Sequence, residues 1–128
     1  MAYRFDFSWL LEYWPAILSG IGITIELILV GGVLGVLLGT ACAWARSLGP
    51  RWIRPVVAAY VELIRNTPFL IQLFFIFFGL PSLGLRMSEL QAANLAMIVN
   101  LGAYGCEIIR AASRRRRGAS SKPGRALP

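Results

Sequence analysis

The sequence has 128 residues, of which 57% are hydrophobic; it contains no histidine and has a mean hydropathy of +0.65. A composition this apolar excludes an ordinary soluble domain and indicates that the solvent of the chain is a bilayer. The formal net charge is +7, but residues 1–112 carry only +1 of it, so the basicity belongs to the C-terminal tail. The positive residues of that tail are Arg114, Arg115, Arg116, Arg117, Lys122 and Arg125.

The N-terminal segment, residues 1–15 (MAYRFDFSWLLEYWP), combines acidic and aromatic residues. It lacks the basic start of a cleavable signal peptide. We expect it to lie at the membrane–water interface, where Trp9, Tyr13 and Trp14 are favoured.

The first predicted span covers residues 17–44, and a crossing needs about 20 residues. Its one charge is Glu26, and a charge at such depth is functional by default, although packing in a seam between subunits is an equal alternative. Gly31, Gly35 and Gly39 recur every fourth residue, so one helix face lacks side chains and a second helix can approach closely. Packing within the chain is the main interpretation, and dimerisation through this face is the alternative.

The loop that follows, residues 45–55, contains three arginines and two prolines. Short arginine-rich loops remain cytoplasmic, which predicts that the N-terminus lies outside. Residues 56–64 then form an amphipathic helical approach along the inner surface, carrying Glu62.

The second predicted span covers residues 68–85 and begins at a polar break, Arg65-Asn66-Thr67-Pro68. Proline suits the first turn of a helix, and Thr67 before it can cap that helix. Residues 69–78 contain five phenylalanines and a single polar side chain, Gln72. We expect Gln72 to hydrogen-bond to another helix.

The third predicted span covers residues 89–110 and returns to the cytoplasm. Asn100, Tyr104 and Glu107 share one helical face, and polar groups in a membrane helix require protein or water beside them. A pore or a helix–helix seam is therefore implied. Glu107 either borders the translocation path or is an interfacial acid paired with Arg110 at i+3.

Taken together, these segments resemble a permease subunit of the polar amino-acid ABC importers, the group that takes up histidine, glutamine, glutamate and arginine. The resemblance covers about residues 15–111. The residues that carry it are the lead-in to the second span (Glu62, Arg65, Asn66, Thr67, Pro68 and Gln72), residues 72–75 and 78–81, and then Asn100, Ala103, Tyr104 and residues 107–111.

The resemblance implies an all-α membrane protein of the bacterial inner membrane, with three helices of the type I ABC importer fold. It also implies a function: half of a pore, with Asn100, Tyr104, Glu107 and Glu26 as candidates for the substrate path. The implied partners are a second permease subunit in a homo- or heterodimer, two cytoplasmic ATPase subunits and a periplasmic amino-acid-binding protein.

The C-terminal tail departs from the family. Where the family has a coupling loop of the form Gly-Ile-Glu-Ala-x-Pro-Arg-Gly and two more spans, residues 113–128 have no hydrophobic period, and we expect them to be disordered. If residues 112–115 are written in the GC-rich codons GCA TCG AGG CGG, moving the frame back by one base gives Gly-Ile-Glu-Ala. Our hypothesis is that a frameshift near Ala112 produced the tail, and that the chain alone does not transport.

Other function classes have less support. The sequence offers no catalytic constellation, phosphate loop or metal cluster, so we expect no enzyme activity, cofactor or metal, and ATP hydrolysis would belong to a partner. A nucleic-acid partner for the tail is disfavoured against a cytoplasmic flank of a membrane helix. The alternative function is a stand-alone small membrane protein, either a proton-coupled exporter or an assembly or regulatory fragment.

Overall fold

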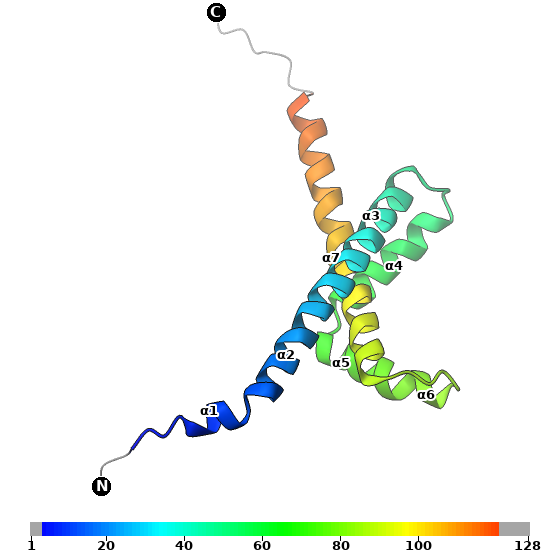
Figure 1. The fold of residues 1–128 in the computed structure, drawn as a ribbon. Helices are drawn as coiled ribbons and strands as arrows, with labels where there is room; N and C mark the ends of the chain where they lie inside the picture. The colour runs from blue at the N-terminus through cyan, green and yellow to red at the C-terminus, as the bar shows by residue number, and fades with distance from the viewer. Residues whose placement is uncertain (1–3, 121–128) are drawn as a thin grey trace, which may run out of the picture.

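The computed structural model describes residues 4–120, and the side chains through residue 118. Within that range the chain is helical, without strands (Figure 1). Two helices are long and apolar enough to cross a membrane, and a pair of helices that meet at a sharp bend makes a third crossing if the pair is counted as one span.

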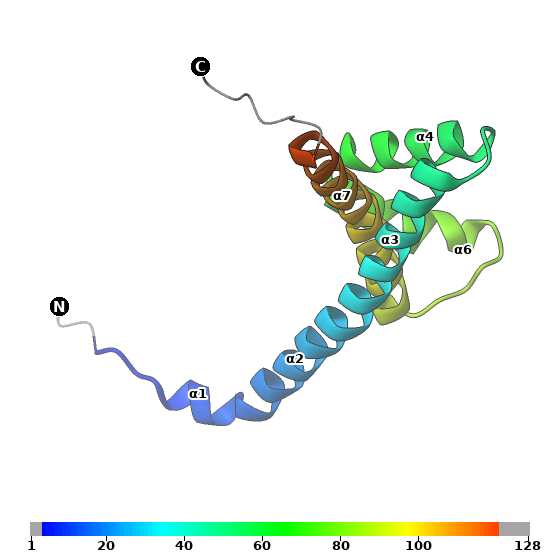
Figure 2. The same ribbon diagram turned by 90° about the horizontal axis from the view of Figure 1, so that it is seen from above.

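The first crossing is one continuous helical rod from Trp14 to Leu48. It consists of α2 (Trp14–Glu26), a π-helical turn η1 (Leu27–Gly31) and α3 (Gly32–Leu48), and a short helix α1 (Ser8–Glu12) precedes it. At 1.5 Å per residue the rod is about 52 Å long, so its ends extend beyond a hydrocarbon core of about 30 Å. Its α2 part stands away from the other helices in both views (Figures 1 and 2).

The second crossing is bent. Helix α4 (Ile53–Arg65) meets the run α5 (Phe69–Phe74), η2 (Phe75–Gly79) and α6 (Leu80–Ser82) at 108°. The amphipathic approach and the break at residues 66–68 are therefore confirmed. The segments α5, η2 and α6 have 6, 5 and 3 residues, so together they are about 21 Å long. This helical run is shorter than the span predicted over residues 68–85, and its length is less than the thickness of the hydrocarbon core, about 30 Å.

The start of α5 differs in detail from the prediction. Pro68 is the N-cap residue in an extended conformation rather than a first-turn residue. Thr67 does not cap the helix; its hydroxyl donates to the Leu63 carbonyl of α4 at 2.8 Å. The reason is local, since a threonine hydroxyl near a helix end competes for the carbonyl four residues earlier.

The third crossing, α7 (Glu89–Ser120), packs in parallel against α3. A Cβ at Gly31 would meet Met97, one at Gly35 would meet Leu101, and one at Gly39 would meet backbone atoms of Gly102, Gly105 and Cys106. The glycine face is thus covered within the chain, which confirms the main interpretation. Dimerisation through this face was the wrong alternative, because α7 already occupies it.

The core of the bundle lies where α3, α4 and α7 meet. Ala43, Val61, Ala103 and Cys106 are buried there, with Tyr60 packed against them. These side chains are small, so the helices approach closely, and van der Waals packing of this kind is a main source of helix association in lipid.

The C-terminal tail corrects another expectation. Residues 113–120 were predicted to be disordered, but α7 continues through them to Ser120. Alanine and arginine are strong helix formers, and a helix already nucleated in the membrane propagates at little cost. Residues 121–128 of the expected tail lie outside the described residues.

Candidate functional site

A polar pocket of about 390 Å³ lies between α3, α4 and α7, beside the last turn of α3. Such a concentration of charge is unusual in a chain with so much apolar surface, and polar groups inside membrane proteins mark solute paths or helix seams. Its charged and polar lining consists of Arg46, Glu62, Arg65, Asn66, Tyr104, Glu107 and Arg110.

Glu107 forms the centre of an ion-pair network on one wall. Its carboxylate lies 3.2 Å from Arg46 of α3 and 3.8 Å from Arg110 one turn further along α7. The Arg46 side chain is only 16% exposed, whereas that of Glu107 is 35% exposed and faces the pocket. The expected pairing with Arg110 is present, but the shorter contact is to Arg46.

Arg65 and Tyr104 face each other across the pocket. The guanidinium carbon of Arg65, at the end of α4, lies 5.7 Å from the centroid of the Tyr104 ring, within the range of a cation–π interaction. The Arg65 guanidinium makes no salt bridge or hydrogen bond among the described residues, so its donors remain available to a solute.

Gln72 joins the bend to the third crossing. Its amide nitrogen donates to the carbonyls of Ile64 (2.8 Å) and Thr67 (2.7 Å), and its amide oxygen accepts from Asn100 of α7 at 3.2 Å. The side chain is 6% exposed. Gln72 thus satisfies carbonyls that the break in the helix leaves open, and the expected bond to another helix is present.

The structure brings most of the candidate residues together. Asn100, Tyr104 and Glu107 project from α7 toward the bend and the pocket, where they meet residues of the lead-in motif. Glu62, Arg65 and Asn66 line the pocket, whereas Thr67 and Pro68 form the turn beneath it.

Glu26 lies apart from this group. It is exposed on the outer half of the first rod and has no hydrogen bond or ion pair within residues 4–120. The register of α3 against α7 puts it roughly 20 Å from the level of Glu107 along the helix axis. A carboxylate at this position requires cover by other protein or by water.

Two residues of the site were missed by the sequence analysis. Arg46 was counted only as part of a cytoplasmic loop, yet it lies in the last turn of α3 and pairs with Glu107. Tyr60 of α4 donates its hydroxyl to the Val99 carbonyl of α7 and fixes α4 against that helix. The apolar period of α4 gives Tyr60 a core position but no indication of its partner.

Comparisons with known proteins support one family. The chain is 39% identical over 100 residues to the L-cystine transport system permease protein TcyB of Bacillus subtilis, which covers 78% of this chain and 43% of TcyB. It is 35% identical to the arginine transport system permease protein ArtQ of the same organism, over 83% of this chain and 49% of ArtQ. It is 34% identical to the glutamine transport system permease protein GlnP of Escherichia coli, over 85% of this chain and 51% of GlnP.

The fold comparison agrees. A crystal structure described as an amino acid ABC transporter with histidines matches 95% of this chain and 60% of its own, with a TM-score of 0.79 and 29% identity. No protein-family model matches. The chain spans about half the length of the curated relatives it matches.

These relatives are transport permeases, and the chain has their helices and long apolar spans. It is a multi-pass protein of the bacterial inner membrane, as expected from the sequence. With at least 34% identity to three permeases over more than three quarters of its length, the chain belongs to the family of amino-acid ABC transporter permeases.

Proposed function

We propose that this chain is part of the pore subunit of an importer for a polar amino acid, and that its polar pocket borders the inner end of the substrate path. The observation that carries the proposal is the pocket itself, which gathers charged side chains of both signs from three helices. An amino acid has a carboxylate and an ammonium group, and a pocket with guanidinium and carboxylate groups offers partners to both.

Within the pocket the residues have different roles in this proposal. Arg65 presents to the solute a guanidinium whose hydrogen-bond donors are available, and Tyr104 presents the polar edge of its aromatic ring. Glu107 is held in place by Arg46 and Arg110, so its carboxylate is oriented toward the pocket. The hydrogen bond between Asn100 and Gln72 stabilises the wall of the pocket on the side further from the cytoplasm.

Glu26 belongs to a different part of the assembly in this proposal. Its exposed position on the outer half of the first rod favours a place beside the path or in a seam with the second permease subunit, homologous or identical. The further partners are two ATPase subunits on the cytoplasmic side and a periplasmic binding protein that delivers the amino acid. A coupling loop that follows Ala111 in another reading frame would connect the subunit to its ATPase.

The first test is the DNA sequence downstream of the Ala111 codon. We expect another frame to encode a coupling loop and two further apolar spans, and the chain read in that frame to support ATPase-dependent amino-acid uptake. Uptake should fall with Glu107→Gln and remain with Glu89→Gln, which removes the same charge at the exposed outer end of α7. Proton-driven export by the 128-residue chain without an ATPase would contradict the proposal and favour a stand-alone small exporter.

A further inference from the structure

The inner end of α7 carries four consecutive arginines, Arg114–Arg117, that the pore proposal does not use. They are helical and exposed, and no acidic residue follows Glu107 in the chain. Other arginines at this end are already engaged: Arg46 and Arg110 pair with Glu107, and Arg54 donates to the Gly49 and Ser47 carbonyls. Within the described part of the chain, Arg114–Arg117 form no ion pair.

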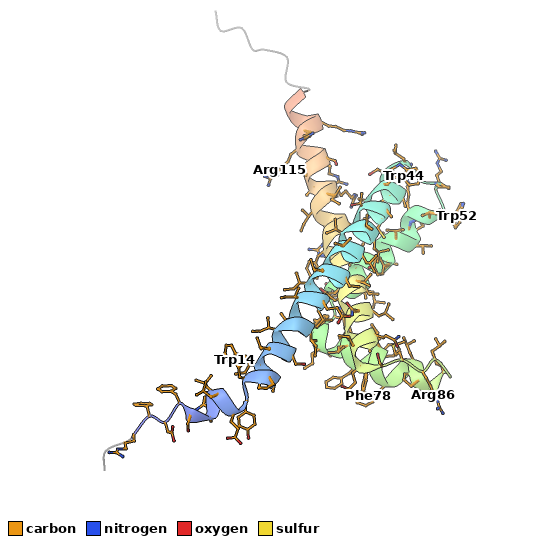
Figure 3. The ribbon with its side chains drawn as sticks, viewed as in Figure 1. Trp14, Trp44, Trp52, Phe78, Arg86 and Arg115 are labelled. Carbon is orange, nitrogen blue, oxygen red and sulfur yellow. The ribbon has the colours of Figure 1, made fainter. Side chains whose placement is uncertain are left out.

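The depth of these arginines follows from their neighbours. A pocket is lined by Trp44 and Ser47 of α3 together with Ile109 and Ser113 of α7, and the register of the two helices puts Ser113 about one helical turn beyond Trp44. Trp44 is 64% exposed, and exposed tryptophans at the end of a span mark the membrane–water interface. Figure 3 shows Trp44, Trp52 and Arg115 at one end of the molecule, opposite Trp14, Phe78 and Arg86.

Arg114–Arg117 therefore begin about 6 Å beyond Trp44 along the helix axis and extend about 5 Å further. Phospholipid headgroups occupy this depth. Successive helix positions are rotated by about 100°, so the four guanidinium groups point around most of the helix circumference. Such an arrangement fits a surrounding layer of anions better than a single directional pocket.

We propose that Arg114–Arg117 bind the phosphate groups of anionic phospholipids in the inner leaflet and thereby anchor the end of α7. Guanidinium groups bind phosphate oxygens in a bidentate manner, and clusters of arginine just inside a membrane span recognise anionic headgroups. Lipid is favoured over nucleic acid because the cluster emerges directly from the bilayer, where a duplex would have to approach the anionic membrane surface. The proposal concerns this chain as it stands and does not depend on the transport proposal.

The test measures lipid retained by the purified full chain in mild detergent, using native mass spectrometry. Phosphatidylglycerol and phosphatidylcholine with matched acyl chains are supplied at equal concentration. We expect preferential retention of phosphatidylglycerol, a partial loss with R115Q/R116Q and a loss of about tenfold or more when all four arginines become glutamine. The variant R4Q/R86Q, which also removes two exposed arginines, should retain lipid like the parent.

A variant with four lysines in place of Arg114–Arg117 separates charge from folding. The lysine variant should keep the preference for phosphatidylglycerol. Circular dichroism of the variant with four glutamines should show unchanged helix content, because glutamine and arginine have similar helix propensities. Equal retention of the two lipids by the parent, or unchanged retention by the glutamine variant, would overturn the proposal. A DNA duplex that displaces phosphatidylglycerol at physiological salt would overturn it in favour of nucleic acid.

Discussion

At the scale of single residues, Gln72 makes three hydrogen bonds that no apolar side chain could make. The break at residues 66–68 removes backbone hydrogen bonds between α4 and α5, and within a bilayer no water replaces them. Gln72 donates to the Ile64 and Thr67 carbonyls beside the break and accepts from Asn100, so one side chain stabilises the bend and attaches it to α7.

Substitution of Gln72 should therefore be costly for its size. Gln72→Leu leaves the Thr67 carbonyl and the Asn100 amide without partners and leaves the Ile64 carbonyl with only the Thr67 N–H at 3.3 Å, and we expect a loss of about 1–3 kcal/mol in the free energy of unfolding. A double-mutant cycle with Asn100→Leu should give a coupling of about 0.6 kcal/mol, at most about 1.7 kcal/mol. Reversible unfolding in bicelles measures both values.

Asn94 provides the matched control and lies about one and a half turns before Asn100 on α7. Its amide oxygen is buried and has no hydrogen-bond partner among the described residues, so Asn94→Leu should change stability little or increase it. An equal loss for Gln72→Leu and Asn94→Leu would contradict the role assigned to Gln72.

Side-chain pairing was only partly predictable at this scale. The bond between Glu107 and Arg110 follows from helical spacing, because residues at i and i+3 are neighbours. The shorter bond to Arg46 joins residues 61 positions apart and depends on how α3 is rotated against α7. Periodicity identifies the face of each helix but not the register between two faces.

At the scale of elements, the seam between α3 and α7 depends on missing side chains. The glycines differ in what a methyl group would meet: at Gly35 it would lie 2.7 Å from the Leu101 Cβ, which cannot move without the backbone, whereas at Gly31 it would meet the flexible end of Met97. The seam is therefore more sensitive at Gly35 than at Gly31.

We expect Gly35→Ala to lower the free energy of unfolding by about 1–3 kcal/mol, as overpacking does in a close-packed interior. The control is Gly32→Ala on the open side of the same helix, where no atom lies within 4 Å of the added methyl group. That change should be neutral or stabilising by up to about 1 kcal/mol, because alanine is the better helix former. Equal stabilities of the two variants in bicelles would show that the seam is not close-packed.

The bend and the tail show what composition reveals about elements and what it hides. Pro68 after a polar break indicates an interruption, and the structure has one there. Residues 113–120 lack a hydrophobic period, which is typical of disorder, but a helix that starts inside a membrane continues through alanine and arginine without one.

At the scale of the whole molecule, the two ends differ in character. Trp44 and Trp52 lie at one end with the arginine-rich link of residues 45–55, while Trp14, Phe78 and Arg86 lie at the other end (Figure 3). Arginine-rich flanks remain cytoplasmic, so the link between α3 and α4 is expected inside and the loop after α6 outside.

Cysteine labelling tests this orientation in intact cells. Ser47→Cys, at the exposed end of α3, should resist a membrane-impermeant maleimide, whereas Ser82→Cys, at the exposed end of α6, should react. The parent chain serves as background, since Cys42 is half-buried and Cys106 is buried. Labelling of Ser47→Cys alone would reverse the predicted topology.

The order and direction of the three crossings could be predicted from apolar runs, arginine-rich loops and the break before Phe69. The packing of the crossings could not, because it depends on long-range pairs such as Tyr60 with Val99. The glycine ladder indicated that a helix would approach, and only the structure identifies that helix as α7.

The seam has a mechanical consequence. Because Gly39 of α3 lies directly against the backbone of α7 and Gly35 lies against the Leu101 Cβ, no flexible side chain separates the helices there to absorb a displacement. A force on the cytoplasmic end of α7 is therefore transmitted to α3, and the two helices behave as one lever. Any rearrangement of the bundle must then move the two helices together.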